Sequence, residues 1–135
     1  MASKIKAIGA LRPRIEQGKT AQKPDLLRAA SRATGLVEGT LDLSIREIRD
    51  QIIEFCRAGR AVKIDGLGTW TPNLRLDGSL DIQYRADNAL VNSLNLPGVF
   101  SGKVLNSENI GKSGADLVTL WNSEHPEDPV EEEGE

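Results

Sequence analysis

The residues with the clearest chemical potential are Lys and Arg side chains in a glycine-containing stretch, VKIDGLGTWTPNLRLDGSLDIQYR, at residues 62–85. Lys63 precedes a pair of glycines, Arg75 comes just before an Asp-Gly turn signal, and Arg85 ends the stretch. Cations of this kind neutralise phosphates, so they are candidates for contact with a nucleic-acid backbone. Exposed Lys and Arg are also the norm on protein surfaces, so each one alone is explained about equally well as a solvated charge.

The Gly66-Leu67-Gly68 sequence in this stretch does not have the context of a nucleotide-binding loop. It lacks the third Gly of a dinucleotide fingerprint and the Lys of a phosphate loop, and no helix is predicted after it. We interpret these glycines as positions that need unusual backbone geometry. Trp70 is expected to pack beneath a sheet, whereas Tyr84 fits either packing or base stacking.

The chain offers no convincing set of catalytic or metal-binding residues. Cys56 and His125 are the single Cys and the single His, and they lie far apart in the sequence. A metal site needs several nitrogen, sulfur or oxygen ligands, which this pair does not supply. Carboxylates gather chiefly at the C-terminal end, where no burial is expected to raise a pKa. We therefore expect a non-enzymatic protein without cofactor, metal or small-molecule substrate.

Charge is strongly segregated along the chain, although the net charge is only −3. Residues 1–23 carry six Lys and Arg against one Glu, a formal charge of +5. Residues 124–135 carry seven Asp and Glu and no Lys or Arg, and residues 24–123 carry −1. Basic arms often follow phosphates or enter a minor groove, although many only keep a protein soluble. The further candidate DNA-binding residues are Lys4, Lys6, Arg12 and Arg14.

Local signals predict two helices in the first half of the chain. Pro24 suits a first helical turn and Gly35 a C-terminal stop. A longer helix is predicted over residues 41–56, with Thr40 as its cap and Gly59 at its end. Its apolar stripe consists of Leu41, Ile45, Ile48, Ile52 and Phe55. A stripe this broad in so small a chain favours dimerisation, with an ordinary core as a nearly equal alternative.

A β-hairpin sheet and further helices are predicted after these two. Residues 62–76 are expected to form bent or extended strands, and Asp77-Gly78 is a strong hairpin signal before a returning strand. A short helix follows over residues 87–95, and Ser113 is placed to cap a last one. These elements give an α+β fold.

The composition suits one compact domain with tails. The chain has 135 residues, and 39% of them are hydrophobic. It contains no apolar run long enough to span a membrane, and residues 1–14 do not resemble a signal peptide. Its lone Cys cannot form an internal disulfide, so a reducing cytoplasm is the expected location.

The order of these motifs resembles the histone-like HU/IHF family of bacterial DNA-binding proteins. The resemblance covers residues 23–95 and rests on TGLVEGT between the two helices, on AGRAVKIDGLGTW, and on IQYRADNALVNSLN. It implies an HU-like fold, in which a two-helix base carries an antiparallel three-stranded β-hairpin sheet, followed by short C-terminal helices. It also implies a homodimer that binds the backbone of duplex DNA with low sequence specificity, in a nucleoid-associated, architectural role.

The sequence also departs from the family's pattern. Only TPNLRLDGSLDI separates the two hairpin strands, where the family has a long basic arm, and residues 96–135 have no counterpart in its short members. The alternative function is a protein-interaction or assembly module that has lost DNA binding. The expected organisation is a basic flexible arm at 1–22, the HU-like domain at 23–95, an extension with a helix at 96–123, and a disordered acidic tail at 124–135.

Overall fold

The computed structural model describes residues 2–131, and in these residues the protein is α+β, as expected. Five α-helices accompany one three-stranded antiparallel sheet and one two-stranded sheet among the described residues. The chain divides into two compact units. We call residues 19–100 the central unit, and residues 1–18 together with 101–135 the terminal unit.

The central unit begins with two helices that pack on each other, α2 (Lys23–Thr34) and α3 (Glu38–Arg57). Pro24 lies in the first turn of α2, and Gly35 ends that helix in the left-handed conformation at φ 76°, as predicted. The second helix starts before Thr40, which was expected to cap it. The carbonyl of Val37 accepts hydrogen bonds from the amides of Thr40 and Leu41, so the first turn closes on Val37 without a side-chain cap.

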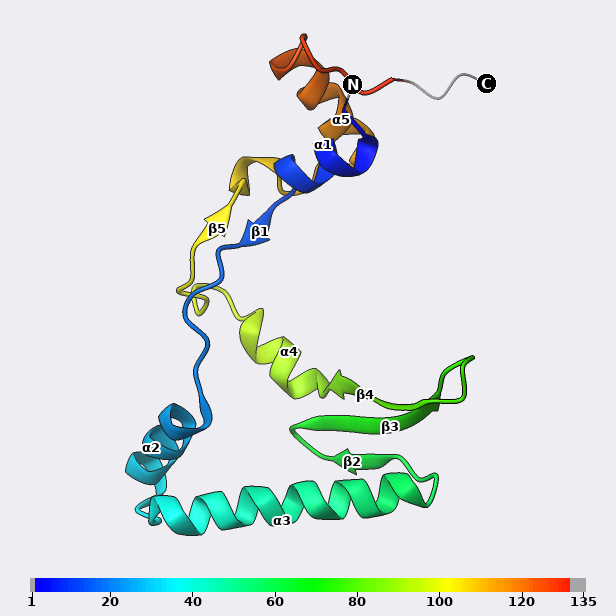
Figure 1. The fold of residues 1–135 in the computed structure, drawn as a ribbon. Coiled ribbons are helices and arrows are strands. Elements are labelled where there is room, and N and C mark those ends of the chain that lie inside the picture. Colours follow the sequence, from blue (N-terminus) through cyan, green and yellow to red (C-terminus); the bar gives the residue numbers. More distant parts are fainter. Residues whose placement is uncertain (1, 132–135) are drawn as a thin grey trace. The chain divides into compact units, whose positions relative to one another are not determined.

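The predicted hairpin sheet follows, with strand order β2-β3-β4. Its strands are β2 (Val62–Ile64), β3 (Gly68–Leu74) and β4 (Leu80–Ala86), and all neighbours are antiparallel. Figure 1 shows α3 running beside this sheet, and contacts join α3 to both β2 and β3. A short helix, α4 (Asn88–Leu94), begins after β4, with the Asp87 side chain accepting a hydrogen bond from the amide of Ala89.

Apolar side chains of the central unit remain largely uncovered. Within residues 19–100, all of which the structure describes, Leu27 is the only buried apolar side chain. The stripe of α3 is present, yet Ile45, Ile48 and Phe55 are all exposed by more than a third of their area. One copy of this unit therefore does not bury the apolar surface that its sequence provides.

The terminal unit brings the two ends of the chain together. Its elements are α1 (Lys4–Leu11), β1 (Arg14–Ile15), β5 (Val104–Leu105), the 3-10 turn η1 (Ser107–Asn109) and α5 (Gly114–Glu124). Figure 1 shows α1 beside α5 and β1 beside β5, and both pairings are present in the contacts. The expectation of a flexible arm over residues 1–22 is therefore wrong for residues 4–15, which form a helix and a strand.

Side chains from the C-terminal part hold α1 in place. Asn109 is 1% exposed, and its Nδ2 donates to the carbonyl oxygen of Leu11 at 2.7 Å. The Nδ2 of Asn106 donates to the carbonyl oxygens of Ala10 and Arg12. These amides satisfy carbonyls that the end of a helix otherwise leaves unpaired. The order of α1 thus depends on residues nearly one hundred positions away.

The core of the terminal unit includes part of the acidic end of the chain. Ala2, Ala7, Trp121 and Val130 form a buried apolar cluster, and Ala2 pairs with Val130 in an isolated parallel bridge. The prediction of disorder from residue 124 onward is therefore wrong for the segment that leads to Val130, while residues 132–135 lie outside the described residues. Burial of Val130 against Trp121 explains the difference, because it gives this polar segment an apolar anchor.

Helix α5 follows its sequence signals. The hydroxyl of Ser113 accepts a hydrogen bond from the amide of Asp116, and the Asp116 carboxylate accepts one from the amide of Ser113, which together form a capping box. Among residues 2–131, no helix has the length and apolar character needed to cross a membrane.

Candidate nucleic-acid interface

The strand register collects polar side chains on one face of the central sheet. Thr69 of β3 lies opposite Lys63 of β2 on one side and opposite Arg85 of β4 on the other. Residues directly opposite one another in antiparallel strands project from the same face, so these three form one row across the sheet. We call this set the cationic row. Two residues along, Thr71 and Gln83 form the next pair on the same face.

The opposite face of the sheet is apolar and lies toward α3. Its pairs include Val62 with Trp70, Trp70 with Tyr84, and Pro72 with Ile82. Pro72 and Ile82 line a groove of about 710 Å³ whose other wall contains residues of α3, and Asn73 and Asp81 from the other face of the sheet line it at the hairpin end. Because side chains alternate between faces along a strand, the cationic row projects away from α3. The sheet therefore has one face for packing and one for contact with a partner.

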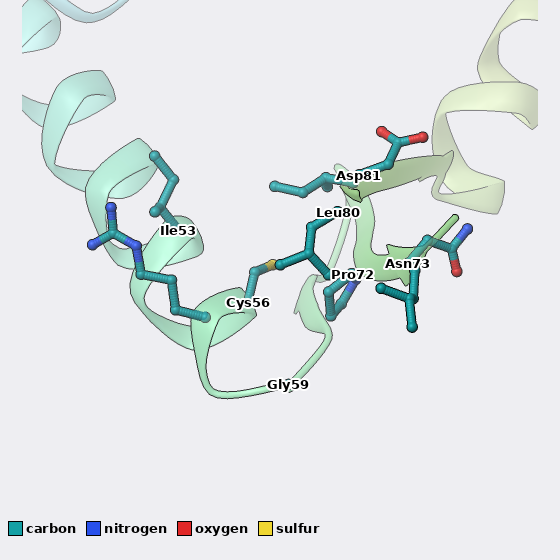
Figure 2. Close-up of a pocket in the computed structure, with 10 residues that line it drawn as sticks. Ile53, Cys56, Gly59, Pro72, Asn73, Leu80 and Asp81 are labelled. Atoms are coloured by element: carbon teal, nitrogen blue, oxygen red, sulfur yellow. The ribbon is translucent and has the colours of Figure 1, made fainter. Parts of the chain in front are cut away.

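Figure 2 shows the residues that line this groove. Cys56 projects from α3 toward Pro72 and Leu80 of the hairpin, and Ile53 lies one turn earlier on the same helix. The groove is open, and its lining is mainly apolar, with Arg57, Asn73 and Asp81 as its polar residues. Such a surface is unfavourable in water unless another apolar surface covers it.

A glycine fixes the position of the strand that carries Arg85. Gly68 has φ +152°, and a Cβ atom there would lie 2.4 Å from the carbonyl oxygen of Arg85 and 2.6 Å from Cε2 of Tyr84. The Tyr84 hydroxyl donates to the carbonyl oxygen of Leu67 at 2.8 Å, which closes this corner of the sheet. Only Gly permits so close an approach of the strands.

Both aromatic residues of this region take part in that packing. The rings of Trp70 and Tyr84 have centroids 5.1 Å apart, with an interplanar angle of 43°. Trp70 is only partly exposed, which fits the expectation that it packs beneath the sheet. Tyr84 keeps half of its surface exposed, but its hydroxyl is engaged with the backbone. Its fixed position favours a packing role over stacking on bases.

The sequence-predicted cations of the sheet differ in their surroundings. The Arg75 guanidinium pairs with Asp81 at 3.2 Å, and Lys63 lies 3.9 Å from Asp65. Arg85 makes no ion pair with any residue of the described chain. Arg75 is therefore partly neutralised and lies at the hairpin end, outside the cationic row. Arg85 is the cation best placed to meet an external anion.

Two further carboxylates near the hairpin are held in the ionised form. Hydrogen bonds from the side chain and backbone of Ser79 keep the pKa of Asp77 below its usual range. The amides of Ala89 and Gly66 lower the pKa of Asp87 in the same way. Each carboxylate serves the local backbone, at the hairpin turn and at the start of α4. They offset part of the positive charge, so the interface is not strongly basic.

The N-terminal candidates belong to the terminal unit. Lys4 and Lys6 lie on α1, Arg12 caps its C-terminal end, and Arg14 lies on β1. Arg14 donates through Nη1 to the carbonyl oxygen of Gly9 at 3.2 Å, whereas Lys6 pairs with Asp128. The structure thus brings Lys63 and Arg85 together in one unit and the four N-terminal cations together in the other.

Thr69, Thr71 and Gln83 are polar members of the interface that the sequence reasoning missed. The alternation of polar and apolar residues in TWTPN and DIQYR marks the face on which they lie. Which residues lie opposite one another follows only from the register. A scan against protein-family models and a search of curated proteins gave no match to this chain.

Proposed function

We propose that the central unit is a divergent HU-like domain that binds the backbone of duplex DNA with low sequence specificity. The observation that carries this proposal is the cationic row, Lys63–Thr69–Arg85, on the face of the sheet turned away from α3. The resemblance of residues 23–95 to the HU/IHF family supports the same function. The role is architectural and nucleoid-associated, and the protein is not an enzyme.

The chemistry of this face suits phosphates better than base edges. The two cations are separated by two strand spacings, about 10 Å, so they can neutralise separate phosphate groups. Thr69, Thr71 and Gln83 supply neutral hydrogen-bond donors, which position a protein on the DNA backbone without reading its sequence. With so few cations in the row, binding is expected to be weak and strongly dependent on salt.

A homodimer is part of this proposal. Ile45, Ile48 and Phe55 of α3 are partly exposed, and the groove beside Cys56 has a mainly apolar lining. A second copy that covers these surfaces would supply the core that one central unit lacks. The dimer would also present two cationic rows to one DNA molecule, and phosphate contacts add in their effect on affinity.

The test is a salt titration of duplex binding by a row variant and a matched control. Lys63→Ala with Arg85→Ala removes two charges from the row. Arg28→Ala with Arg32→Ala removes two exposed charges from α2, neither of which forms an ion pair with a described residue. The row variant should lose affinity, and its log–log salt slope should become shallower by about 1.8, or 0.9 for each phosphate contact.

The control defines the refuting result. If the α2 variant loses as much affinity as the row variant, the effect is one of net charge and the row is not the interface. If scrambling the DNA sequence at constant salt changes affinity strongly, binding is not driven by the backbone. Either outcome rejects the proposal as stated.

A protein-interaction or assembly module is the second candidate. The hairpin end favours it, because Leu74, Leu76 and Leu80 are all more than 70% exposed there. The charge of the central unit also favours it, since 11 Lys and Arg against 10 Asp and Glu leave a formal charge of +1. Self-association without measurable binding to duplex DNA at low salt would support this function over the first.

A further inference from the structure

The acidic end of the chain is fastened to the terminal unit. We call residues 126–131 the C-terminal strap. Trp121 donates through Nε1 to the carbonyl oxygen of Asp128 at 2.8 Å, and the amide of Val130 donates to Oδ1 of Asn122 at 2.7 Å. The amide of Ala2 donates to the carbonyl oxygen of Pro129. Backbone contacts thus anchor the strap on both α5 and the segment before α1.

The anchored strap places a carboxylate on a cation of α1. Lys6 donates through Nζ to Oδ2 of Asp128 at 3.2 Å, and the ammonium lies 5.6 Å from the centroid of the Trp121 ring. The Lys6 side chain is 60% exposed, so it remains within reach of an external anion. A phosphate that binds Lys6 must compete with the carboxylate of Asp128.

The acidic residues of the strap and of the segment after it together determine the sign of the charge on this unit. Residues 1–18 and 101–135 contain 6 Lys and Arg and 10 Asp and Glu, a formal charge of −4. Six of the ten acidic residues lie at or after Glu127, and without them the unit would carry +2. The cations of α1 are therefore placed in a net negative unit, which repels a polyanion at long range.

We propose that the C-terminal strap is an intramolecular competitor that occupies Lys6 and keeps the terminal unit from binding DNA. The inference rests on the proposed function, since it concerns the regulation of DNA binding. When a DNA phosphate displaces Asp128, the backbone anchors of the strap remain, so no unfolding is required. The competition weakens as salt rises, because mobile ions screen exposed charges beyond about 8 Å at physiological ionic strength.

The ion pair is tested by Asp128→Asn in the full-length protein. This change removes the charge, keeps the side-chain shape, and leaves the Asp128 backbone carbonyl that accepts from Trp121. The matched control is Glu108→Gln, an exposed residue of η1, which changes the charge of the unit equally. Affinity for a random-sequence duplex is measured for both variants at low and at physiological salt.

Asp128→Asn should bind DNA roughly 1.5- to 5-fold more tightly than wild type at low salt, the range typical of one exposed ion pair. The gain should exceed that of Glu108→Gln and should shrink at physiological salt. In a Lys6→Gln background, Asp128→Asn should give a smaller gain, because the Lys6 ammonium that Asp128 occupies is absent. Hydrogen exchange of α1 and α5 should match wild type in every variant.

The remaining outcomes overturn the inference in distinct ways. Equal gains in Asp128→Asn and Glu108→Gln would show an effect of net charge alone, without competition at Lys6. A gain that is undiminished in the Lys6→Gln background would exclude Lys6 as the target. If wild type binds DNA through the cationic row and Asp128→Asn changes nothing, the strap is not a competitor. If no variant binds DNA at any salt concentration, the proposed function itself fails, and the inference fails with it.

Discussion

Replacing Gly68 with Ala tests how the sheet positions Arg85. The new Cβ atom would lie 2.4 Å from the carbonyl oxygen of Arg85 and 2.6 Å from Cε2 of Tyr84. The first of these atoms belongs to the backbone of β4, so it cannot move without disturbing the pairing of Thr69 with Arg85. Tyr84 is also constrained, because its hydroxyl donates to the carbonyl oxygen of Leu67.

Two costs add at this position. A non-glycine residue at φ +152° is strained, and such strain costs of order 1–3 kcal/mol. Forcing an extra carbon into a packed site typically costs a further 1–3 kcal/mol. The free energy of unfolding should therefore fall by about 3 kcal/mol. The displaced β4 should also weaken DNA binding, because Arg85 would leave the cationic row.

Two other glycines supply matched controls for urea unfolding at one fixed protein concentration. Gly66 has φ +86° with nothing within 4 Å of an added Cβ, so Gly66→Ala bears the strain alone and should cost about 1 kcal/mol. Gly39 lies in α3 with open space around it, so Gly39→Ala should stabilise by up to about 1 kcal/mol. If Gly68→Ala costs no more than Gly66→Ala, the close approach of β4 does not restrict this position.

Three further predictions concern association, pH and the terminal unit. Sedimentation at micromolar concentration should show a wild-type dimer and a monomeric Ile48→Asp variant, and a wild-type monomer would refute dimerisation. A hydrogen bond from Lys23 holds the pKa of Asp42 below its usual range. This interaction therefore stabilises the fold above the pKa that Asp42 has in the unfolded chain, and the stabilisation is lost as pH falls through the pKa of Asp42 in the folded chain. Asp42→Asn should therefore reduce the loss of stability in acid urea melts, and an unchanged acid profile would contradict this. Asn109→Ala leaves the Leu11 carbonyl without its donor and should lower the free energy of unfolding by about 2 kcal/mol in urea, so an unchanged midpoint would refute the capping role.

Local chemistry determined most elements of the central unit from the sequence. Pro24 and Gly35 mark the ends of α2, and Asp77-Gly78 marks the hairpin turn, because each acts through its own backbone preference. Ser113 predicted the start of α5 for a similar reason. The α+β class and the three-stranded sheet follow from such signals, whereas the HU-like arrangement stays a proposal.

The sequence alone did not determine the register of the sheet. From the sequence alone, Lys63, Arg75 and Arg85 are about equally plausible as contacts to DNA. Pairing through Thr69 separates Arg85 and Lys63, which share a row, from Arg75, which pairs with Asp81. A shift of one residue would have moved each side chain of a strand to the other face.

Only the tertiary structure determined that the segments near the two ends of the chain are ordered. The KIKAIGAL sequence of α1 includes Gly9 and has no strong apolar stripe, so its local signals for a helix are weak. The composition of the acidic end predicts a fully solvated segment. The structure orders α1 through Asn109 and Trp121, and it anchors the strap through the burial of Val130. Local patterns do not encode contacts between residues about a hundred or more positions apart, because such contacts form only when the whole chain brings the two surfaces together.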